Sequence, residues 1–427
     1  MRQAKQTPRA IQVCAHWKGL PEPIFMGTLY SALTRGKEIF SFEYDPQWLK
    51  SPHAQVLDPN LGLFGGPQYA RDEQPNFGMF LDSSPDRWGR MLMQRREAQL
   101  ARQEDRDIRK LMESDYLLGV FDGHRMGALR FRLSARGPFL DTNAEMAAPP
   151  WTRLRDLEYA SLQIERDNAE KDKDYMKWLM LLIAPGGSLG GARPKAEVVD
   201  ENGHLWIAKF PSRRDETNIG AWEYLAYQLA TNAGVETATA RIQRFSGKYD
   251  TFLTKRFDRT EAGERIHFAS AMTLLGKKDG DSGETGVSYL DIAEFVIKNG
   301  AQVRKDLEQL WRRIVFNIGV SNVDDHLRNH GFLLQKGGWV LSPAFDMNPS
   351  VTGDGLLLNI SKDDNAQNLD LALSVAPLFR IKKARAEQII CEVSTSVGKW
   401  RSLAKKIGFA KIAMDRMQRA FRVLSQH

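Results

Sequence analysis

The segment SNVDDHLRN, which runs from Ser321 to Asn329, carries the residue types that phosphoryl transfer requires. Asp324 and Asn329 are five residues apart, which is the D-x-x-x-x-N spacing of catalytic loops that transfer phosphate. Such a loop can place a carboxylate at an acceptor hydroxyl, where it acts as a base, and an amide oxygen on Mg²⁺. We expect His326 to pack inside the loop and to orient Asp324. The alternative is a polar loop that only ends the apolar helix before it.

A further carboxylate follows at a spacing suited to a metal site. Asp346 comes just after the short apolar strand expected at WVLSP, seventeen positions beyond Asn329. Mg²⁺ prefers carboxylate, amide and phosphate oxygens, so these two side chains are a sufficient protein contribution. His326 and His330 have a spacing that could hold zinc on a helix, but they fall in a polar loop. Leu327 also stands where a zinc protease motif has glutamate, so we favour magnesium.

A glycine-rich segment upstream could cradle the phosphates of ATP. Four glycines fall within six residues of GGSLGGARPK, from Gly186 to Lys195, so backbone N–H groups could approach phosphate oxygens without obstruction. The segment precedes a strand and lacks the Walker spacing, and a simple flexible turn is the alternative. Its predicted nucleotide-binding residues are Ser188, Gly190, Gly191, Ala192 and Lys195.

A lysine in the next strand is the predicted cation for those phosphates. In HLWIAKF, Lys209 shares a face with Leu205 and Ile207, a costly place for a charge unless it is paired or meets phosphate. Glu223, on the following helix, is the natural ion-pair partner. A strand-edge lysine that reaches out to solvent is the alternative.

The elements that would position these residues are both helices and strands. A helix is expected from Ser84 or Asp86 through RWGRMLMQRREAQLARQ, and two strands, AEVVD and HLWIAKF, should form a hairpin across Glu201-Asn202-Gly203. Another helix should begin after Asn218 and stop at Gly234. We divide the chain into an amino-terminal subdomain at residues 1–150, an N-lobe at 151–260 and a helical C-lobe at 261–427.

Composition restricts the class of protein. The 427 residues are 42% hydrophobic, enough for two or three folded domains. Lys and Arg number 60 against 53 acids, giving a net charge of +7, a mild excess that suits an anionic partner or an ordinary basic protein. Two cysteines without a CxxC pair exclude a disulfide scaffold. No apolar run is long enough to span a bilayer or to form a secretory signal, so a cytoplasmic protein without a membrane partner is expected.

Together these segments resemble the HipA family of bacterial serine/threonine kinases, the toxins of HipA–HipB toxin–antitoxin pairs. The matching sequences are GSLGGARPKA, WIAKFP, TKRFDR, NVDDHLRNHGFLL and LSPAFDMNPS, in family order between Ala184 and Ser350. The sequence PDRWGR at Pro85–Arg90 is similar to the extra amino-terminal subdomain of that family. The resemblance implies an α+β, bilobal protein-kinase-like fold, with a small β-rich N-lobe and a larger all-α C-lobe.

The resemblance also implies roles for individual residues. It assigns the base, the Mg²⁺ ligands and the ATP-phosphate lysine to the residues already named. The hinge that meets adenine and ribose would be formed by Arg256, Phe257 and Asp258. Ser188 matches a serine that such kinases autophosphorylate, and a dianionic group beside the glycines would repel the phosphates of ATP.

The same resemblance implies partners and a function. The acceptor would be a protein of translation, such as an aminoacyl-tRNA synthetase, and its phosphorylation would cause growth arrest or persistence. A HipB-like helix-turn-helix antitoxin would bind the chain and connect it to operator DNA. Two alternatives stay open: a non-catalytic or co-repressor subunit of the antitoxin–DNA complex, and a small-molecule phosphotransferase.

Overall fold

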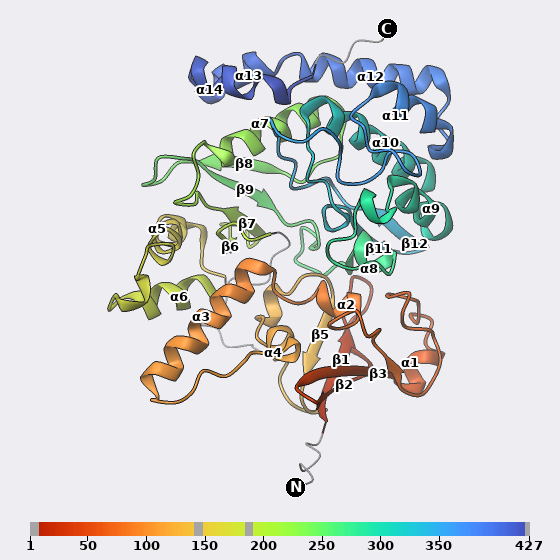
Figure 1. Ribbon diagram of the computed structural model, residues 1–427. Coiled ribbons are helices and arrows are strands. Elements are labelled where there is room, and N and C mark those ends of the chain that lie inside the picture. Colours follow the sequence, from red (N-terminus) through yellow and green to blue (C-terminus); the bar gives the residue numbers. More distant parts are fainter. Residues whose placement is uncertain (1–7, 141–147, 184–190, 423–427) are drawn as a thin grey trace. The chain divides into compact units, whose positions relative to one another are not determined.

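The computed structural model describes residues 8–140, 148–183 and 191–422 (Figure 1). The chain divides into two compact units, each with its own helices and strands. The first contains Met1–Arg213 and Asp258–Ala269, and the second contains Arg214–Phe257 and Ser270–His427. The three-part division predicted from the sequence, with boundaries near residues 150 and 260, stays a prediction.

An antiparallel five-stranded sheet lies at the amino-terminal end of the first unit, in the order β4-β3-β2-β1-β5 (Figure 1). The β2–β3 hairpin turns at Arg35 and Gly36, which both have positive φ, as the tight two-residue hairpin turn requires. The strands are β1 Arg9–Ala15, β2 Ile24–Thr34, β3 Lys37–Tyr44, β4 Gln68–Tyr69 and β5 Leu129–Arg132.

The rest of the first unit contains the predicted helix and hairpin. Helix α3 spans Arg87–Gln103, and its N-cap is Asp86, whose side chain accepts a hydrogen bond from the backbone N–H of Gly89. Gly203, with φ of +82°, lies in the turn between β6 and β7 and permits the sharp reversal. The remaining elements are α1 Pro46–Lys50, α2 Gly78–Leu81, α4 Glu113–Leu118, α5 Leu154–Ile164, α6 Tyr175–Ile183, β6 Lys195–Val199 and β7 Leu205–Lys209.

The second unit is mainly helical and also contains short strands. Helix α7 spans Ile219–Asn232, begins after the capping side chain of Asn218 and stops before Gly234, which has φ of +74°. The remaining elements are β8 Ala240–Gln243, β9 Thr251–Lys255, α8 Ala271–Leu274, α9 Tyr289–Asn299, α10 Val303–Val320, β11 Gly331–Gln335, β12 Gly338–Leu341, α11 Leu369–Val375, α12 Lys383–Val397, α13 Trp400–Ile407 and α14 Lys411–Met417. The short strand β10, Phe268–Ser270, crosses from the first unit to the second.

Helix α10 is the centre of the second unit. Its residues from Leu310 to Val320 are all buried, because α9, α11, α12 and β12 pack around it. Helices α12 to α14 form a row along the top of the view in Figure 1, where α12 packs on α10 and both α12 and α13 pack on α7. Within the described ranges, none of the helices has the length and hydropathy to cross a bilayer.

Candidate active site

The catalytic segment predicted from the sequence begins where α10 ends. Ser321 caps this helix in the left-handed conformation, with φ of +49°, a conformation that glycine adopts more easily than serine does. Its hydroxyl accepts a hydrogen bond from Nε of Arg422 at 3.1 Å. The next residue, Asn322, folds back so that its backbone N–H donates to the carbonyl of Asn317. The helix end therefore fixes where the loop starts.

The carboxylate of Asp325 fastens the loop to the core. Its Oδ2 accepts hydrogen bonds from the Tyr289 hydroxyl at 2.7 Å and from Nδ2 of Asn317 at 2.7 Å, and it lies 2.8 Å from Nε2 of His330. Asp325 is buried, and so are all three partners. We call these four residues the Asp325 cluster.

Electrostatics favour an ionised carboxylate in the Asp325 cluster. Burial alone would raise the pKa of Asp325, but the attraction of His330 and the hydrogen bonds from His330 and Tyr289 outweigh it and lower this pKa below its usual value. Burial and the nearby carboxylate raise the pKa of Tyr289 well above its usual value, so its hydroxyl stays a donor. The guanidinium of Arg313 is also within electrostatic reach of Asp325, and its burial lowers the pKa of Arg313 to about 10.

Removal of one donor should measure how much this cluster contributes. We expect Tyr289→Phe to lower the free energy of unfolding by about 1.5–3 kcal/mol, because the ring is kept while a hydrogen bond to a buried carboxylate is lost. Urea denaturation measures the change. Tyr159→Phe is the matched control, since the Tyr159 ring is half exposed, and it should change stability by less than about 0.5 kcal/mol. An equal effect of the two changes would contradict the assignment.

The loop presents Asp324 and holds Asn329 beside it. Asp324 is exposed, whereas Asn329 is buried and its Nδ2 donates to the backbone carbonyl of Asp324 at 3.1 Å. The same carbonyl accepts the backbone N–H of His326 at 2.9 Å. The Asn329 amide nitrogen is thereby occupied, and its oxygen is the atom left to act as a ligand.

The predicted orienting role of His326 stays a prediction. Its ring is half-buried, and its Nδ1 is buried with no hydrogen-bond partner in the structure. The histidine that is bonded to a carboxylate here is His330, whose Nε2 meets Asp325.

Asp346 lies after β12 in a strained backbone conformation and is connected to the catalytic loop. Its φ is +59°, which a non-glycine residue adopts only where its surroundings hold it. Asn348 donates from Nδ2 to Oδ1 of Asp346 at 3.3 Å, and its backbone N–H donates to Oδ1 of Asn322 at 3.1 Å. Asn322 in turn donates to Asn317 at 3.0 Å, so these residues join Asp346 to the Asp325 cluster.

The side chains around Asp346 suit a hard cation. The predicted ligands, Asn329 and Asp346, offer one amide and one carboxylate, both oxygen donors. Oδ1 of Asn348, directly beside Asp346, is buried without a hydrogen-bond partner, which is costly unless something positive meets it. No group of three or more His, Cys, Asp and Glu side chains gathers within the described ranges. The donor set is therefore of the kind that Mg²⁺ takes from a protein when phosphate supplies the other ligands.

The three residues of the predicted hinge have different surroundings. Arg256 is buried, and the ring of Phe257 packs against Phe345, next to Asp346, with 5.4 Å between centroids. Asp258 is fully buried in the first unit, where its Oδ2 accepts the backbone N–H of Gly127 at 2.8 Å. The contact with ribose stays a prediction, and the structure adds that this carboxylate also anchors its own unit.

The predicted phosphate-binding residues belong to the first unit. Lys209 is buried at the end of β7, and Gly191 and Ala192 are exposed just before β6. Lys195 is buried at the start of β6, where its ammonium binds Oδ2 of Asp86 at 2.8 Å and the carbonyl of Gly191 at 2.7 Å. The structure thus gives Lys195 protein partners of its own.

The structure does not test two further predictions, the roles of Ser188 and Gly190 and the ion pair of Glu223 with Lys209. Ser188 and Gly190 lie outside the described residues. Glu223 is buried in α7 of the second unit, and its pairing with Lys209 of the first unit stays a prediction.

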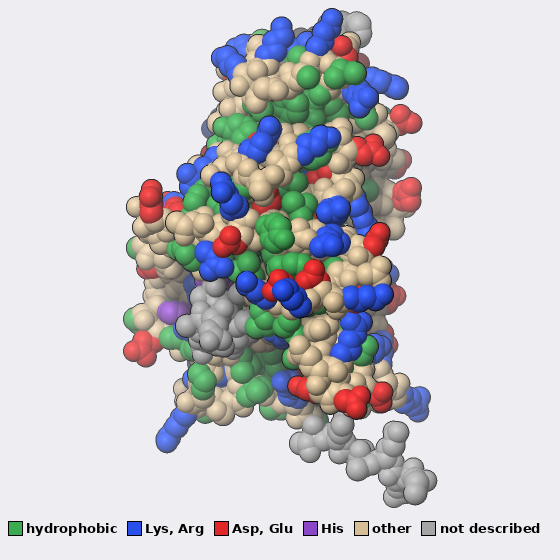
Figure 2. Space-filling model, turned by 90° about the vertical axis from the view of Figure 1, so that its left-hand side faces the viewer, with side chains coloured by type: hydrophobic (Ala, Val, Ile, Leu, Met, Phe, Trp, Pro, Cys, Tyr) green, Lys and Arg blue, Asp and Glu red, His purple; other side chains and the backbone are tan. Residues whose placement is uncertain are grey.

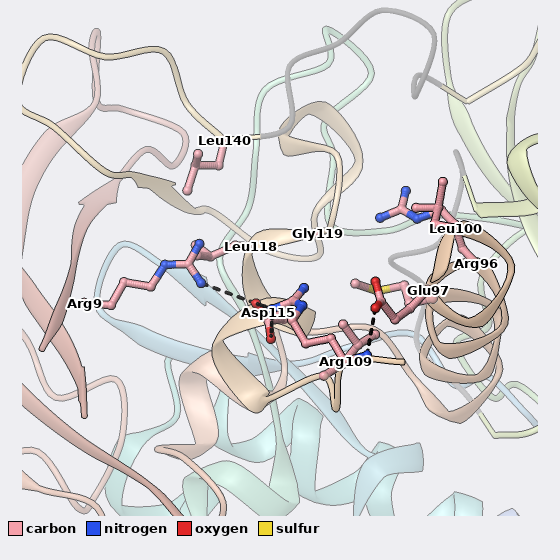
Figure 3. Close-up of a pocket in the computed structure, with 11 residues that line it drawn as sticks. Arg9, Arg96, Glu97, Leu100, Arg109, Asp115, Leu118, Gly119 and Leu140 are labelled. Atoms are coloured by element: carbon pink, nitrogen blue, oxygen red, sulfur yellow. Dashed lines mark hydrogen bonds and ion pairs between the residues drawn. The ribbon is translucent and has the colours of Figure 1, made fainter. Parts of the chain in front are cut away.

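A pocket of about 400 Å³ lies in the first unit, and none of the predicted site residues is among those that line it (Figure 3). Figure 3 shows the guanidinium of Arg9 reaching the carboxylate of Asp115, at 3.4 Å, and Arg109 binds the same carboxylate at 3.0 Å. Glu97, on α3, accepts the backbone N–H of Arg109. The ion pairs connect Arg9 of β1 and Arg109 to Asp115 of α4, and the hydrogen bond connects Arg109 to α3.

The Asp325 cluster was not predicted from the sequence. Asp325 had no predicted role, and neither had Tyr289 or Asn317, which lie in two different helices. The available signal was a tyrosine and an asparagine among the apolar residues of α9 and α10. Spacing could not show that both point at one loop.

Comparisons with known proteins identify the family to which the chain is similar. The family model of the HipA-like C-terminal domain matches residues 187–400, half of the chain. A putative kinase of Haemophilus influenzae is 26% identical over 179 residues, 38% of this chain and 52% of that protein. The serine/threonine-protein kinase toxin HipA of Shewanella oneidensis is 26% identical over 274 residues, 57% of this chain and 60% of that protein.

A solved structure shows that the fold is shared. The complex of HipA, HipB and operator DNA from Shewanella oneidensis MR-1 contains a chain with a TM-score of 0.66 and 17% identity, covering 98% of this chain and 96% of its own. This confirms the predicted α+β, protein-kinase-like fold. The matches to curated relatives span about half of the relatives' own length. Because the family model matches half of the chain and the fold is shared, this chain belongs to the HipA family.

Proposed function

We propose that this protein is an ATP- and Mg²⁺-dependent serine/threonine protein kinase. The observation that carries the proposal is the contrast within the catalytic loop. Asp324 is exposed while its neighbour Asp325 is buried and bonded to three side chains, so the loop is rigid where it meets the core and open where an acceptor would approach. A carboxylate presented in this way can take the proton of an acceptor hydroxyl.

The other residues support the same reaction. Lys209 would bind the phosphates of ATP, and Asn329 and Asp346 would hold Mg²⁺, with Arg256, Phe257 and Asp258 as the adenine and ribose hinge. When bound, the metal neutralises charge on the phosphates. Asp324 would accept the hydroxyl proton on its carboxylate, and the catalytic loop would keep that carboxylate in place. Ser188 would be the autophosphorylation site, and Glu223 would steady Lys209.

The proposed role is that of a HipA-like toxin. The acceptor would be a protein of translation, and its phosphorylation would arrest growth or lead to persistence. A HipB-like helix-turn-helix protein is the proposed partner, because the similar Shewanella protein is assembled with HipB and its operator DNA. The proposed location is the cytoplasm, where ATP and the translation machinery are found.

The charge of the last helices favours a second, compatible role beside operator DNA. Residues 380–422 contain twelve Lys and Arg against three acids, a net charge of +9, whereas the whole chain has only +7, so the remainder is slightly acidic. Figure 2 shows Lys and Arg side chains along the top of the view, where α13 and α14 lie. Such a basic face suits a phosphate backbone. Operator specificity would come from the antitoxin.

A phosphotransfer assay tests the proposal. Purified protein with labelled ATP and Mg²⁺ should phosphorylate itself, with the phosphate mapped to Ser188, and EDTA should reduce this by about 100-fold or more because the phosphate charge is then not neutralised. Lys209→Met should reduce it to a similar degree, while Lys298→Met, at an exposed helix lysine, should not. Phosphorylation that survives EDTA or the loss of Lys209 would contradict the proposed site. Phosphoproteomics after induced expression would then identify the acceptor protein.

A further inference from the structure

Lys195 is held from two sides by protein groups. Its ammonium donates to Oδ2 of Asp86 at 2.8 Å and to the carbonyl of Gly191 at 2.7 Å. The exposed fractions of the two charged side chains are 2% for Lys195 and 7% for Asp86. Gly191 is the last glycine of the glycine-rich segment, so the lysine binds the end of that segment directly.

Asp86 has a second bond that fixes its own position. As the N-cap of α3, it accepts the backbone N–H of Gly89 at 2.9 Å through Oδ1, which leaves Oδ2 for Lys195. Trp88, on the first turn of the same helix, donates from Nε1 to the backbone carbonyl of Lys195 at 3.0 Å. One helical turn therefore holds Lys195 by its side chain and by its backbone, across more than a hundred residues of sequence.

The register of the β6–β7 hairpin gives the ion pair a further consequence. Lys195 lies directly opposite Lys209, so both side chains leave the same face of the hairpin. Like charges in this arrangement repel one another. Because Asp86 neutralises Lys195, the ion pair reduces the repulsion that Lys209 would otherwise meet on this face.

We propose that Asp86 and Lys195 are positioning residues that tie the end of the glycine-rich segment to the amino-terminal part of the chain. Lys195 is then a structural lysine, and it is not a ligand of ATP as the sequence suggested. The sequence PDRWGR acts as the anchor, with Asp86 binding the lysine side chain and Trp88 the lysine backbone. This anchor helps to set the affinity of the protein for ATP. That consequence rests on the proposed kinase function.

Asp86→Asn is the sharpest test, because asparagine keeps the helix cap and removes only the charge. We expect the KM for ATP and the dissociation constant of a fluorescent ATP analogue to rise about tenfold, as for the loss of one charge-assisted hydrogen bond, while kcat changes less than about twofold. Amide hydrogen exchange across Gly191–Ala196 should become faster, with or without nucleotide. A role in stability alone would not separate KM from kcat in this way.

Two further variants complete the design. Asp45→Asn changes the N-cap of α1, which has no lysine partner within the described ranges, and it should leave all three readouts unchanged. Asp86→Asn combined with Lys195→Gln replaces the ion pair by two neutral groups, and we expect it to recover ATP affinity to within about threefold of wild type. If Asp86→Asn alone prevents folding, the double variant can be measured in its place.

The outcomes separate this inference from the proposed function. A folded Asp86→Asn protein with wild-type KM, analogue binding and exchange would overturn the positioning role, even if the protein is an active kinase. Wild-type protein that neither binds ATP nor transfers phosphate would overturn the kinase proposal, and the exchange measurement alone would then decide on the anchor. Loss of kcat without a change in KM would also count against it, because Asp86 would then affect the chemical step.

Discussion

Replacement of Asp324 by asparagine is expected to lower phosphotransfer about 10³-fold and to leave the free energy of unfolding within about 0.5 kcal/mol of wild type. The first effect follows because an amide cannot accept the hydroxyl proton. The second follows because Asp324 is exposed, and the substitution keeps the backbone carbonyl to which Asn329 and His326 donate. Initial rates of autophosphorylation and urea denaturation measure the two quantities on the same preparation.

Asp363→Asn is the matched control for this change. Asp363 is an exposed aspartate of the same unit, outside the catalytic loop, and its replacement should affect neither activity nor stability. Full autophosphorylation by Asp324→Asn would contradict the assignment of Asp324 as the catalytic base. A loss of activity accompanied by unfolding would show instead that the loop needs this carboxylate for its structure.

Replacement of the next residue, Asp325, is expected to reduce stability strongly and to affect activity only through unfolding. Asp325→Ala should lower the free energy of unfolding by about 3–5 kcal/mol, because Tyr289, Asn317 and His330 lose the buried carboxylate that they share. Its effect on activity should be secondary and should follow the fraction of folded protein. Denaturation at neutral pH measures the change, and Asp324→Ala at the neighbouring exposed position is the control. Equal stability of the two alanine variants would contradict the Asp325 cluster.

The pH dependence of this stability difference has a definite sign. The folded-state pKa of Asp325 is lowered, so the carboxylate binds protons less readily in the folded protein than in the unfolded chain. Its contribution is complete above the unfolded pKa of about 3.9 and is lost as the pH falls through the lower folded value. The stability gap between wild type and Asp325→Ala should therefore shrink as the pH falls below about 3.9. A gap that stays unchanged through the acid range in which free carboxylates take up protons would contradict an ionised Asp325 in the folded protein.

Elements whose ends depend on neighbouring residues were predictable from the sequence. Asp86 and Asn218 cap their helices, and Gly203 and Gly234 take the positive φ values expected of a turn and a helix stop. Each of these structures rests on a side chain and a backbone group a few residues apart. Such chemistry is local, and a sequence pattern displays it fully.

The catalytic loop was predictable only in part. The five-residue spacing of Asp324 and Asn329 is a local feature, and the structure places the two residues in contact. The same spacing could not say which of two adjacent aspartates is buried. The partners of Asp325 come from α9 and α10, and Tyr289 is 36 residues away from it in the chain.

Lys195 shows the same limit. A lysine after a run of glycines predicted a ligand for phosphate, and that role stays a prediction; spacing gave no sign that its ammonium binds Asp86, 109 residues earlier. The sequence by itself determined the type and order of the chemical groups and the local turns and caps that hold them. Only the tertiary structure decided which charged side chains are buried and with which partners, because the cost of burying a charge depends on groups that folding brings from distant parts of the chain.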